Sequence, residues 1–268
     1  MADPAFERVA ETGSTNDDLL ARIRAAAAAG QTSFAPCLLV AEHQTSGRGR
    51  QGRRWHARPE SSLTFSIAWP CARADSSGLS LAIGAALADA LEPPAPSAPS
   101  RIALKWPNDL WLRDDGADAT TVLGRKLAGV LVETAPIGRG RVAVIGIGIN
   151  IEIASRQVAD AAAGVAALAE IEPGASAPTT LARIAPSLFA ALRRFDEAGF
   201  APFAERFAAR DLLRGRRVAG SGAAGALAGI AAGVAADGAL LIDTDAGVVA
   251  VASGEWRLAA LATAESPC

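Results

Sequence analysis

The feature of this sequence that most restricts its fold is a run of three glycines and four arginines that ends on a tryptophan, at residues 47–55. Glycines at this density disfavour a helix and let the backbone approach a ligand closely. Arginine guanidinium groups match carboxylate and phosphate oxygens, and the indole of Trp55 offers a flat face for a planar ring. The run is therefore predicted to be a loop that wraps a small anionic molecule.

The second unusual feature is the scarcity of lysine. Of the 26 basic residues, only Lys105 and Lys126 are lysine. The high content of alanine, glycine and arginine is typical of a GC-rich genome, in which lysine tends to be replaced. Arginine cannot replace a lysine whose compact ammonium acts as a point charge in a tight site. Both lysines lie in unusual strings, at residues 105–109 and 125–129, so we interpret them as functional rather than as chance survivors.

Length and composition restrict the class of protein. The 268 residues can bury one sizeable core, or one core and a small module, and the net charge of −2 argues against a general nucleic-acid binder. Three widely spaced cysteines, Cys37, Cys71 and Cys268, predict a reducing compartment, and His43 and His56 lack the spacing of a zinc site. No signal peptide and no membrane-spanning apolar run is evident, so we expect a cytoplasmic protein without a membrane partner.

Hydrophobic periodicity and turn residues divide the chain into two parts. In the first part strands alternate with helices, and a helix is expected to begin within residues 14–18, where hydroxyl or amide side chains can cap it, and to stop at Gly30. After Arg214, short strands with glycine turns predict a small β-barrel. The expected strands are 37–41, 62–69, 102–104, 110–112, 127–133, 142–151, 217–218, 226–234, 239–243 and 248–252, and the further helices are 79–91, 179–195 and 200–213.

Five strings occur in a fixed order: Ser-Thr-Asn at 14–16, the glycine–arginine run at 47–55, Lys-Trp-Pro-Asn-Asp at 105–109, Lys-Leu-Ala-Gly-Val-Leu-Val-Glu at 126–133, and Gly-Ile-Gly-Ile-Asn at 146–150. Each string alone is weak evidence. Together, and at these spacings, they resemble the bacterial biotin–protein ligases, also called biotin–[acetyl-CoA-carboxylase] ligases. The resemblance extends over nearly the whole chain.

The resemblance implies an α+β fold. A catalytic domain related to class II aminoacyl-tRNA synthetases, with a mixed sheet backed by helices, would occupy residues 1–213, and an SH3-like β-barrel would occupy residues 214–268. It also implies a reaction in two steps, with Mg²⁺ as the metal. Biotin and ATP give biotinyl-5′-adenylate and pyrophosphate, and the biotinyl group then passes to a lysine of a biotin carboxyl carrier protein.

By the same resemblance, one group of residues is expected to bind biotin. The ureido head would meet Ser14, Thr15 and Asn16, and Gly129 would let the ligand lie against its strand. The alternative for residues 14–16 is a plain helix N-cap. The full set expected to bind biotin is Ser14, Thr15, Asn16, Gln44, Arg48, Gly49, Arg50, Lys126 and Gly129.

A second group is expected to bind ATP and to support catalysis. Negative charge builds on phosphoryl oxygens during adenylation, so preorganised cations are the main tool for this step. Lys126 would bridge the biotin carboxylate and the α-phosphate, and Arg48 and Arg50 would fold over the adenylate as further catalytic residues. The residues expected to bind ATP are Arg50, Arg53, Trp55, Lys105, Asn108, Asp109, Lys126 and Asn150, with Asp109 as the Mg²⁺ ligand.

Alternatives remain for several of these residues. Trp55 is expected either to stack on the ligand or to pack the base of the loop, and residues 146–150 could be a plain buried strand. Two features depart from the expected pattern. An acidic insertion at 113–121 is predicted to extend a surface hairpin, and only 13 residues precede Ser14, which leaves no room for a winged-helix DNA-binding domain. We therefore expect no DNA partner, while a homodimer stays open.

Three other functions compete with this interpretation. A lipoate–protein ligase or octanoyltransferase would share the fold and a central lysine, but the arginine–glycine loop with Trp55 favours biotin. A non-catalytic binding module for RNA or for an acyl carrier would leave Lys126 unexplained. A biotin sensor without transfer activity is disfavoured because Lys105, Asp109 and Lys126 are all present.

Overall fold

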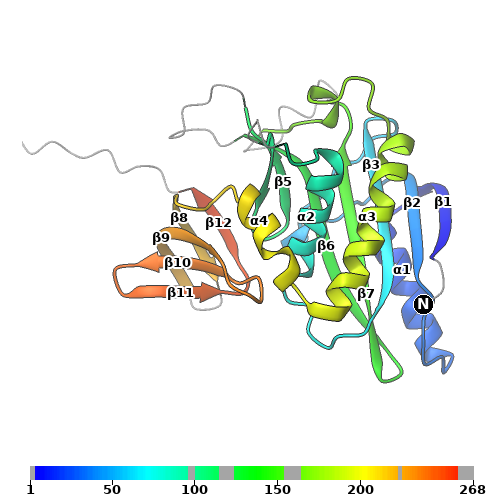
Figure 1. The fold of residues 1–268 in the computed structure, drawn as a ribbon. Helices are drawn as coiled ribbons and strands as arrows, with labels where there is room; N and C mark the ends of the chain where they lie inside the picture. The colour runs from blue at the N-terminus through cyan, green and yellow to red at the C-terminus, as the bar shows by residue number, and fades with distance from the viewer. Residues whose placement is uncertain (1–3, 96–99, 115–123, 154–163, 223–224, 259–268) are drawn as a thin grey trace, which may run out of the picture.

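The computed structural model describes residues 4–95, 100–114, 124–153, 164–222 and 225–258, which form a large and a small sheet with four α-helices (Figure 1). The strands of the large sheet are β1 (Ala5–Thr12), β2 (Cys37–Gln44), β3 (Ser62–Cys71), β4 (Ile102–Lys105), β5 (Asp109–Leu112), β6 (Arg125–Ile137) and β7 (Gly140–Asn150). Their order is β1-β2-β3-β7-β6-β5-β4. The β1–β2 pair is parallel and the other pairs are antiparallel, so the sheet is mixed, as expected.

Helices cover both faces of the large sheet. They are α1 (Thr15–Ala28), α2 (Leu79–Leu91), α3 (Ala177–Ala198) and α4 (Ala204–Arg210). Helices α2 and α3 lie on one face and share the main core with β3 to β7, whereas α1 lies on the opposite face (Figure 1). In β2, Leu38 packs into the α2–α3 core and Leu39 into the α1 core. The first five residues of this strand are all apolar because the strand is buried on both faces.

Helix α1 covers only part of its face of the sheet. Its buried Leu19 and Ile23 share a cluster with Val142 and Val144 of β7. The next two residues of β7 on the same face, because side chains alternate along a strand, are glycines at 146 and 148. The part of the sheet beyond the start of α1 is therefore hollowed, and the candidate site lies there.

The small sheet has five antiparallel strands in the order β11-β10-β9-β8-β12. They are β8 (Arg217–Gly222), β9 (Gly225–Val234), β10 (Leu240–Thr244), β11 (Gly247–Val251) and β12 (Glu255–Leu258). A hydrogen bond joins it to the part of the chain that carries the large sheet: the indole nitrogen of Trp106 donates to the backbone oxygen of Gly238 at 2.9 Å. Gly78 and Gly238 also meet closely at this joint, since a Cβ on Gly238 would lie 2.8 Å from the Cα of Gly78.

Three expectations about the elements were wrong. Strands β1 and β12 were not predicted, and β1 gives no pattern because nearly all its residues are exposed at the sheet edge. The helix expected at 200–213 is a 3₁₀ turn, Ala201–Phe203, followed by α4, which ends at Arg210. It ends there because the backbone nitrogen of Leu212 donates to the oxygen of Leu104 at 2.9 Å, which draws the chain onto β4.

Other expectations stay as predictions. Most of the acidic insertion at 113–121 lies outside the described residues. The division of the chain into domains at 213/214 likewise remains a prediction. Within the described part of the chain, none of the helices has both the length and the apolar character needed to cross a membrane.

Candidate active site

Glycines form the floor of the cavity. Gly129 of β6 pairs with Gly148 of β7, and Gly146 lies between Ser66 of β3 and Leu131 of β6. A Cβ on Gly146 would overlap the amide of Asn16, and one on Gly148 would overlap the indole of Trp55. The absence of side chains at positions 146 and 148 therefore lets Asn16 and Trp55 lie directly on the sheet.

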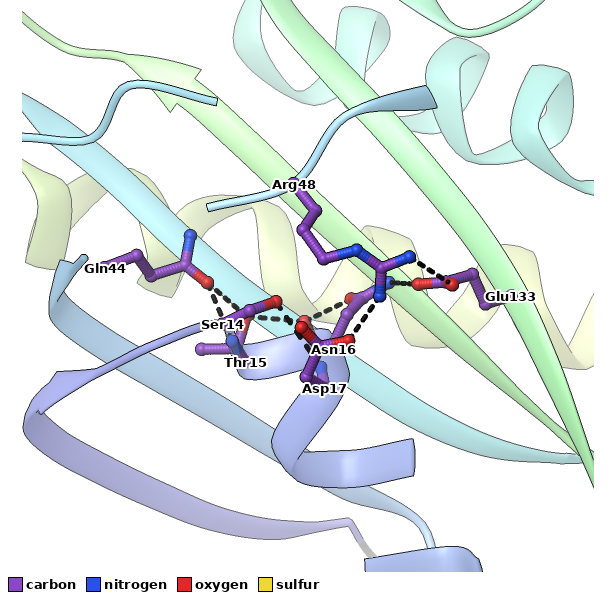
Figure 2. A network of polar contacts seen from close by, with 8 residues as sticks. Ser14, Thr15, Asn16, Asp17, Gln44, Arg48 and Glu133 are labelled. Atoms are coloured by element: carbon purple, nitrogen blue, oxygen red, sulfur yellow. Dashed lines mark hydrogen bonds and ion pairs between the residues drawn. The ribbon is translucent and has the colours of Figure 1, made fainter. Parts of the chain in front are cut away.

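One end of the cavity is a chain of hydrogen bonds at the N-terminus of α1 (Figure 2). A cap was expected among the polar side chains that begin this helix, and Ser14 is the residue that forms it, accepting from the backbone nitrogen of Asp17. The amide of Asn16 donates to Glu133 at 2.9 Å and accepts from Ser66 at 2.6 Å. These contacts join α1 to β3 and β6, which are distant in the sequence, and they make this end of the cavity a rigid polar surface.

Thr15 connects this chain to Gln44. Its hydroxyl lies 2.6 Å from that of Ser66, and its backbone nitrogen donates to Gln44 Oε1 at 2.7 Å. Ser14, Thr15 and Asn16 are each only 3% exposed. Buried polar groups are nearly always hydrogen-bonded, and here the bonds run from one residue to the next without a gap.

The glycine–arginine run forms a closed loop over the cavity, as predicted. Arg48 and Arg54 form an antiparallel bridge, and the nitrogen of Gly49 donates to the oxygen of Arg53 at 2.7 Å. Gly52 at the tip has φ +72°, a conformation that favours glycine. At the base, a Cβ on Gly47 would meet the backbone oxygen of Trp55 at 2.5 Å, so only glycine fits.

Arg48 binds two carboxylates (Figure 2). Its guanidinium pairs with Asp17 and lies 3.0 Å from Glu133. Burial lowers the pKa of Arg48, but the hydrogen bond to Asp17 and the charge of Glu133 outweigh it and hold the pKa above its ordinary value. This side chain fastens the loop to α1 and β6.

Lys126 and Trp55 meet at the centre of the cavity. The Nζ atom of Lys126 lies 2.7 Å from Asp109 Oδ1 and 5.6 Å from the centroid of the Trp55 ring. The ring therefore lies between the loop and the sheet, where it can both pack against Gly148 and face a ligand. A lysine paired with one carboxylate and one aromatic face is held in place but keeps donors for an anion.

The turn between β4 and β5 supplies the other end of the cavity. Asn108 donates to the backbone oxygen of Val130 at 2.8 Å and accepts from Arg50 at 3.4 Å. Lys105 lies over the ring of Trp111, with its Nζ 5.3 Å from the centroid. The Lys-Trp-Pro-Asn-Asp string is thus fixed against β6 beside Lys126.

The cavity wall gathers nearly all the residues predicted to form the site. Fourteen of the fifteen line it: Ser14, Thr15, Asn16, Gln44, Arg48, Gly49, Arg50, Arg53, Trp55, Lys105, Asn108, Asp109, Lys126 and Gly129. Among the described residues, the wall contains six cations, namely Arg54 and the five predicted ones, and one carboxylate, that of Asp109. This excess of positive charge suits an anionic ligand.

Asn150 is the exception and is not found in the wall. Its side-chain nitrogen donates to the backbone oxygens of Ala166 and Lys126, at 3.1 and 3.3 Å. It therefore supports the backbone of the strand that carries Lys126, and its expected role in ATP binding stays a prediction.

Sequence reasoning missed five residues of this region. Ser66 and Glu133 complete the hydrogen-bond chain, Gly146 and Gly148 form the floor, and Trp256 of β12 closes the wall from the small sheet. A signal for the glycines was present, because they alternate with isoleucines and so share one face of the strand. Glu133 lies in the string at 126–133, but nothing in the sequence predicts that it pairs with Asn16.

The described residues contain no cluster of three or more histidine, cysteine or acidic side chains that could hold a metal. A divalent ion in this cavity would have Asp109 as its protein carboxylate, and this carboxylate also pairs with Lys126. Such a donor set fits Mg²⁺ bound mainly through the phosphates of a nucleotide.

Two protein-family models match parts of this chain. A model of the biotin/lipoate A/B protein ligase family matches residues 29–150, and a model of the biotin protein ligase C terminal domain matches residues 215–255. The chain is 33% identical over 261 residues to the biotin–[acetyl-CoA-carboxylase] ligase of Mycobacterium tuberculosis, which covers 92% of this chain and 86% of that protein.

A second relative and a solved structure support the same family. The bifunctional ligase/repressor BirA of Escherichia coli is 34% identical over 224 residues, covering 82% of this chain and 65% of BirA. The structure of biotin protein ligase from Aquifex aeolicus in complex with biotin and ATP has a TM-score of 0.73 at 25% identity, covering 95% of this chain and 99% of that one.

The fold, the cationic cavity and these relatives define an enzyme of the ligase class. The predicted α+β fold, a mixed sheet with helices followed by a small SH3-like domain, is confirmed. The chain belongs to the biotin protein ligases of the biotin/lipoate A/B protein ligase family.

Proposed function

We propose that this ligase activates biotin with ATP to biotinyl-5′-adenylate and then transfers the biotinyl group to a lysine of a biotin carboxyl carrier protein. One observation carries the proposal: a single cavity has six cationic side chains in its wall and, at one end, an uncharged chain of hydrogen bonds from Gln44 to Asn16. Biotin combines a neutral ureido head with a carboxylate. The structure of the Aquifex aeolicus biotin protein ligase, a complex with biotin and ATP, supports the same pair of substrates.

The first step joins two anions. The ureido head would lie against α1, which places the carboxylate towards Lys126 at the centre of the cavity. The carboxylate oxygen attacks the α-phosphorus in line, and the bond to the pyrophosphate oxygen breaks. Lys126 would neutralise charge on both groups as it builds, and Arg50, Arg53 and Lys105 would do so around the phosphates.

Bound Mg²⁺ would neutralise phosphate charge and orient the leaving pyrophosphate. Asp109 is the residue of this chain that would hold it, together with phosphate oxygens. Because Asp109 Oδ1 also pairs with Lys126, the same carboxylate would position the catalytic ammonium.

In the second step, the carrier lysine attacks the carbonyl carbon of the adenylate as a neutral amine, and AMP leaves. No histidine lies in the described cavity wall. The leaving group is already activated, so holding the amine next to the anhydride can supply most of the rate enhancement. The closed loop at residues 47–55 would exclude water from the anhydride until the carrier arrives.

The test is biotin-dependent exchange of label between pyrophosphate and ATP, run in parallel with lipoic acid. Exchange with biotin alone, followed by labelling of a biotin carboxyl carrier domain, is the expected result. Exchange with lipoic acid alone would assign the chain to the lipoate ligases of the same family. No exchange with either acid would contradict adenylation and leave a binding protein.

A further inference from the structure

The hydrogen-bond chain of Figure 2 has a direction, and that direction starts at Glu133. An ionised carboxylate can only accept hydrogen bonds. The side chain of Asn16, 2.9 Å from Glu133 Oε2, must therefore present its NH₂ group to Glu133. Its Oδ1 atom then faces Ser66, at 2.6 Å, and can only accept there. The carboxylate thus fixes which way the Asn16 amide is turned.

The direction of the chain continues through the hydroxyl groups of Ser66 and Thr15. Each hydroxyl has one proton. The hydroxyl of Ser66, which is fully buried, donates its hydrogen bond to Asn16 Oδ1. In the 2.6 Å contact between Ser66 and Thr15, the proton must then come from Thr15. The Thr15 hydroxyl is left with lone pairs only.

Gln44 is oriented in a similar way. Its Oε1 accepts from the backbone nitrogen of Thr15 at 2.7 Å, so its NH₂ group is turned towards Gly47. Gln44 Oε1 lies 3.1 Å from the Thr15 hydroxyl, whose single proton is already committed to Ser66. Two acceptor oxygens therefore lie side by side in residues of the cavity wall.

We propose that Glu133 is a specificity-determining residue: by fixing the direction of the chain Glu133–Asn16–Ser66–Thr15, it makes this end of the cavity select a ligand that brings an N–H donor. The proposal rests on the proposed function, since the ureido head of biotin supplies such donors. The dithiolane ring of lipoic acid has none and would leave the buried acceptors unpaired. Sites built around a buried hydrogen bond reject analogues that lack the partner group strongly.

Two neighbours keep Glu133 in this role. Arg48 holds the other carboxylate oxygen, Oε1, at 3.0 Å, so the charged form is paired although the side chain is only 24% exposed. Gly146 leaves room for the Asn16 amide, because a Cβ there would overlap Asn16 Oδ1. The direction of the chain is thus set by groups that do not themselves need to touch the ligand.

The experiment measures the binding of three ligands by titration calorimetry: biotin, biotin methylated on either ureido nitrogen, and lipoic acid. The variants are Glu133→Gln, which has nearly the same shape but an amide that can donate, and Asp17→Asn as the matched control. Asp17 also pairs with Arg48 but has no place in the directed chain. Circular dichroism melting would show that both variants are folded.

In the wild-type protein, methylation of the nitrogen that faces Thr15 is expected to weaken binding by about 100-fold, and lipoic acid should bind weakly or not at all. Glu133→Gln should weaken biotin by about 10-fold and shrink the methylation penalty to a few-fold, because the chain can now reverse. Asp17→Asn should keep biotin affinity within about threefold and retain the full methylation penalty.

Two other results would overturn the proposal while leaving the ligase function intact. One is an unchanged methylation penalty in Glu133→Gln, and the other is the same loss of biotin affinity in Glu133→Gln and Asp17→Asn, which would assign the effect to Arg48 alone. A wild-type protein that binds no biotin would instead contradict the proposed function itself.

Discussion

The two ends of the cavity are built in different ways. At the α1 end, polar groups on α1, β3 and β6 hydrogen-bond to one another and lie on regular elements. At the other end, the cations are Arg50, Arg53 and Arg54 of the loop at 47–55 and Lys105, the last residue of β4. Loops can move more readily than packed strands.

This difference suits two tasks. A fixed end can discriminate between small ligands, because any mismatch leaves a buried group unpaired. A cationic end carried by loops can admit a bulky triphosphate, close over it and later admit a carrier lysine. Mutations at the α1 end are therefore expected to change the Kd for biotin, whereas mutations at the cationic end should change the constants for ATP and for the adenylate.

The largest effect is expected for Lys126→Ala. Loss of the central ammonium should reduce biotin-dependent pyrophosphate exchange by about 1,000-fold, because charge on the transferring phosphoryl group is no longer neutralised. Biotin affinity should fall by about tenfold at most, since the α1 end is intact. Exchange assays and calorimetry would measure the two effects, with Arg139→Ala in the exposed β6–β7 turn as the control. Normal exchange in Lys126→Ala would remove this lysine from the mechanism.

A matched pair of glycine variants separates the two ends directly. Gly146→Ala forces a Cβ into the Asn16 amide, and Gly148→Ala forces one into the Trp55 indole. The first should raise the Kd for biotin, and the second the KM for ATP, each by about 10- to 100-fold. Gly140→Ala on the same strand, where the nearest atom is 3.7 Å away, is the control. Equal effects of both variants on both constants would refute the separation.

Arg50→Ala should act on the loop end alone. Arg50 lies in the cavity wall and donates to Asn108, so its loss should loosen the cover over the adenylate. We expect biotinyl-adenylate to leave about tenfold faster, with promiscuous labelling of nearby proteins and an unchanged Kd for biotin. Release of labelled adenylate through a spin column would measure the rate. A rate equal to that of wild type would exclude the covering role.

The smallest effect is expected at the joint with the small sheet. Trp106→Phe removes the hydrogen bond to Gly238 and should cost about 1 kcal/mol of folding free energy, with a few-fold rise in the KM for ATP. Trp111→Phe is the control, because its indole nitrogen has no hydrogen-bond partner in the described structure. Urea unfolding of both variants would make the comparison. Equal stability losses would show that the joint does not depend on this bond.

The sequence predicted the elements that alternate clearly and the strings that carry unusual residues. Helix α1 begins within the polar string predicted to start it, and the run at 47–55 is a loop. Strand β1 could not be predicted, because exposure on both faces leaves no periodic signal. The site residues came from local strings, which is why fourteen of fifteen line one cavity.

What the sequence could not predict are partners brought together by tertiary structure. Asn16 and Glu133 are 117 residues apart, and no local pattern joins them. Asn150 stands in a suitable string, yet its amide supports the backbone instead of facing the cavity. Arg210 looks like an ordinary charge at a helix end, but it is 2% exposed and is held by Asp89 and Glu92.

Three of the five tryptophans, Trp55, Trp106 and Trp256, lie in the wall of one cavity, and the chain contains no tyrosine. Its near-ultraviolet emission is therefore dominated by indole rings, and three of the five lie in the wall of the site where a ligand would enter. Intrinsic tryptophan fluorescence therefore reports on the state of the cavity. Quenching or a spectral shift on addition of each substrate would follow loading of the cavity in real time, without a label and without a coupled assay.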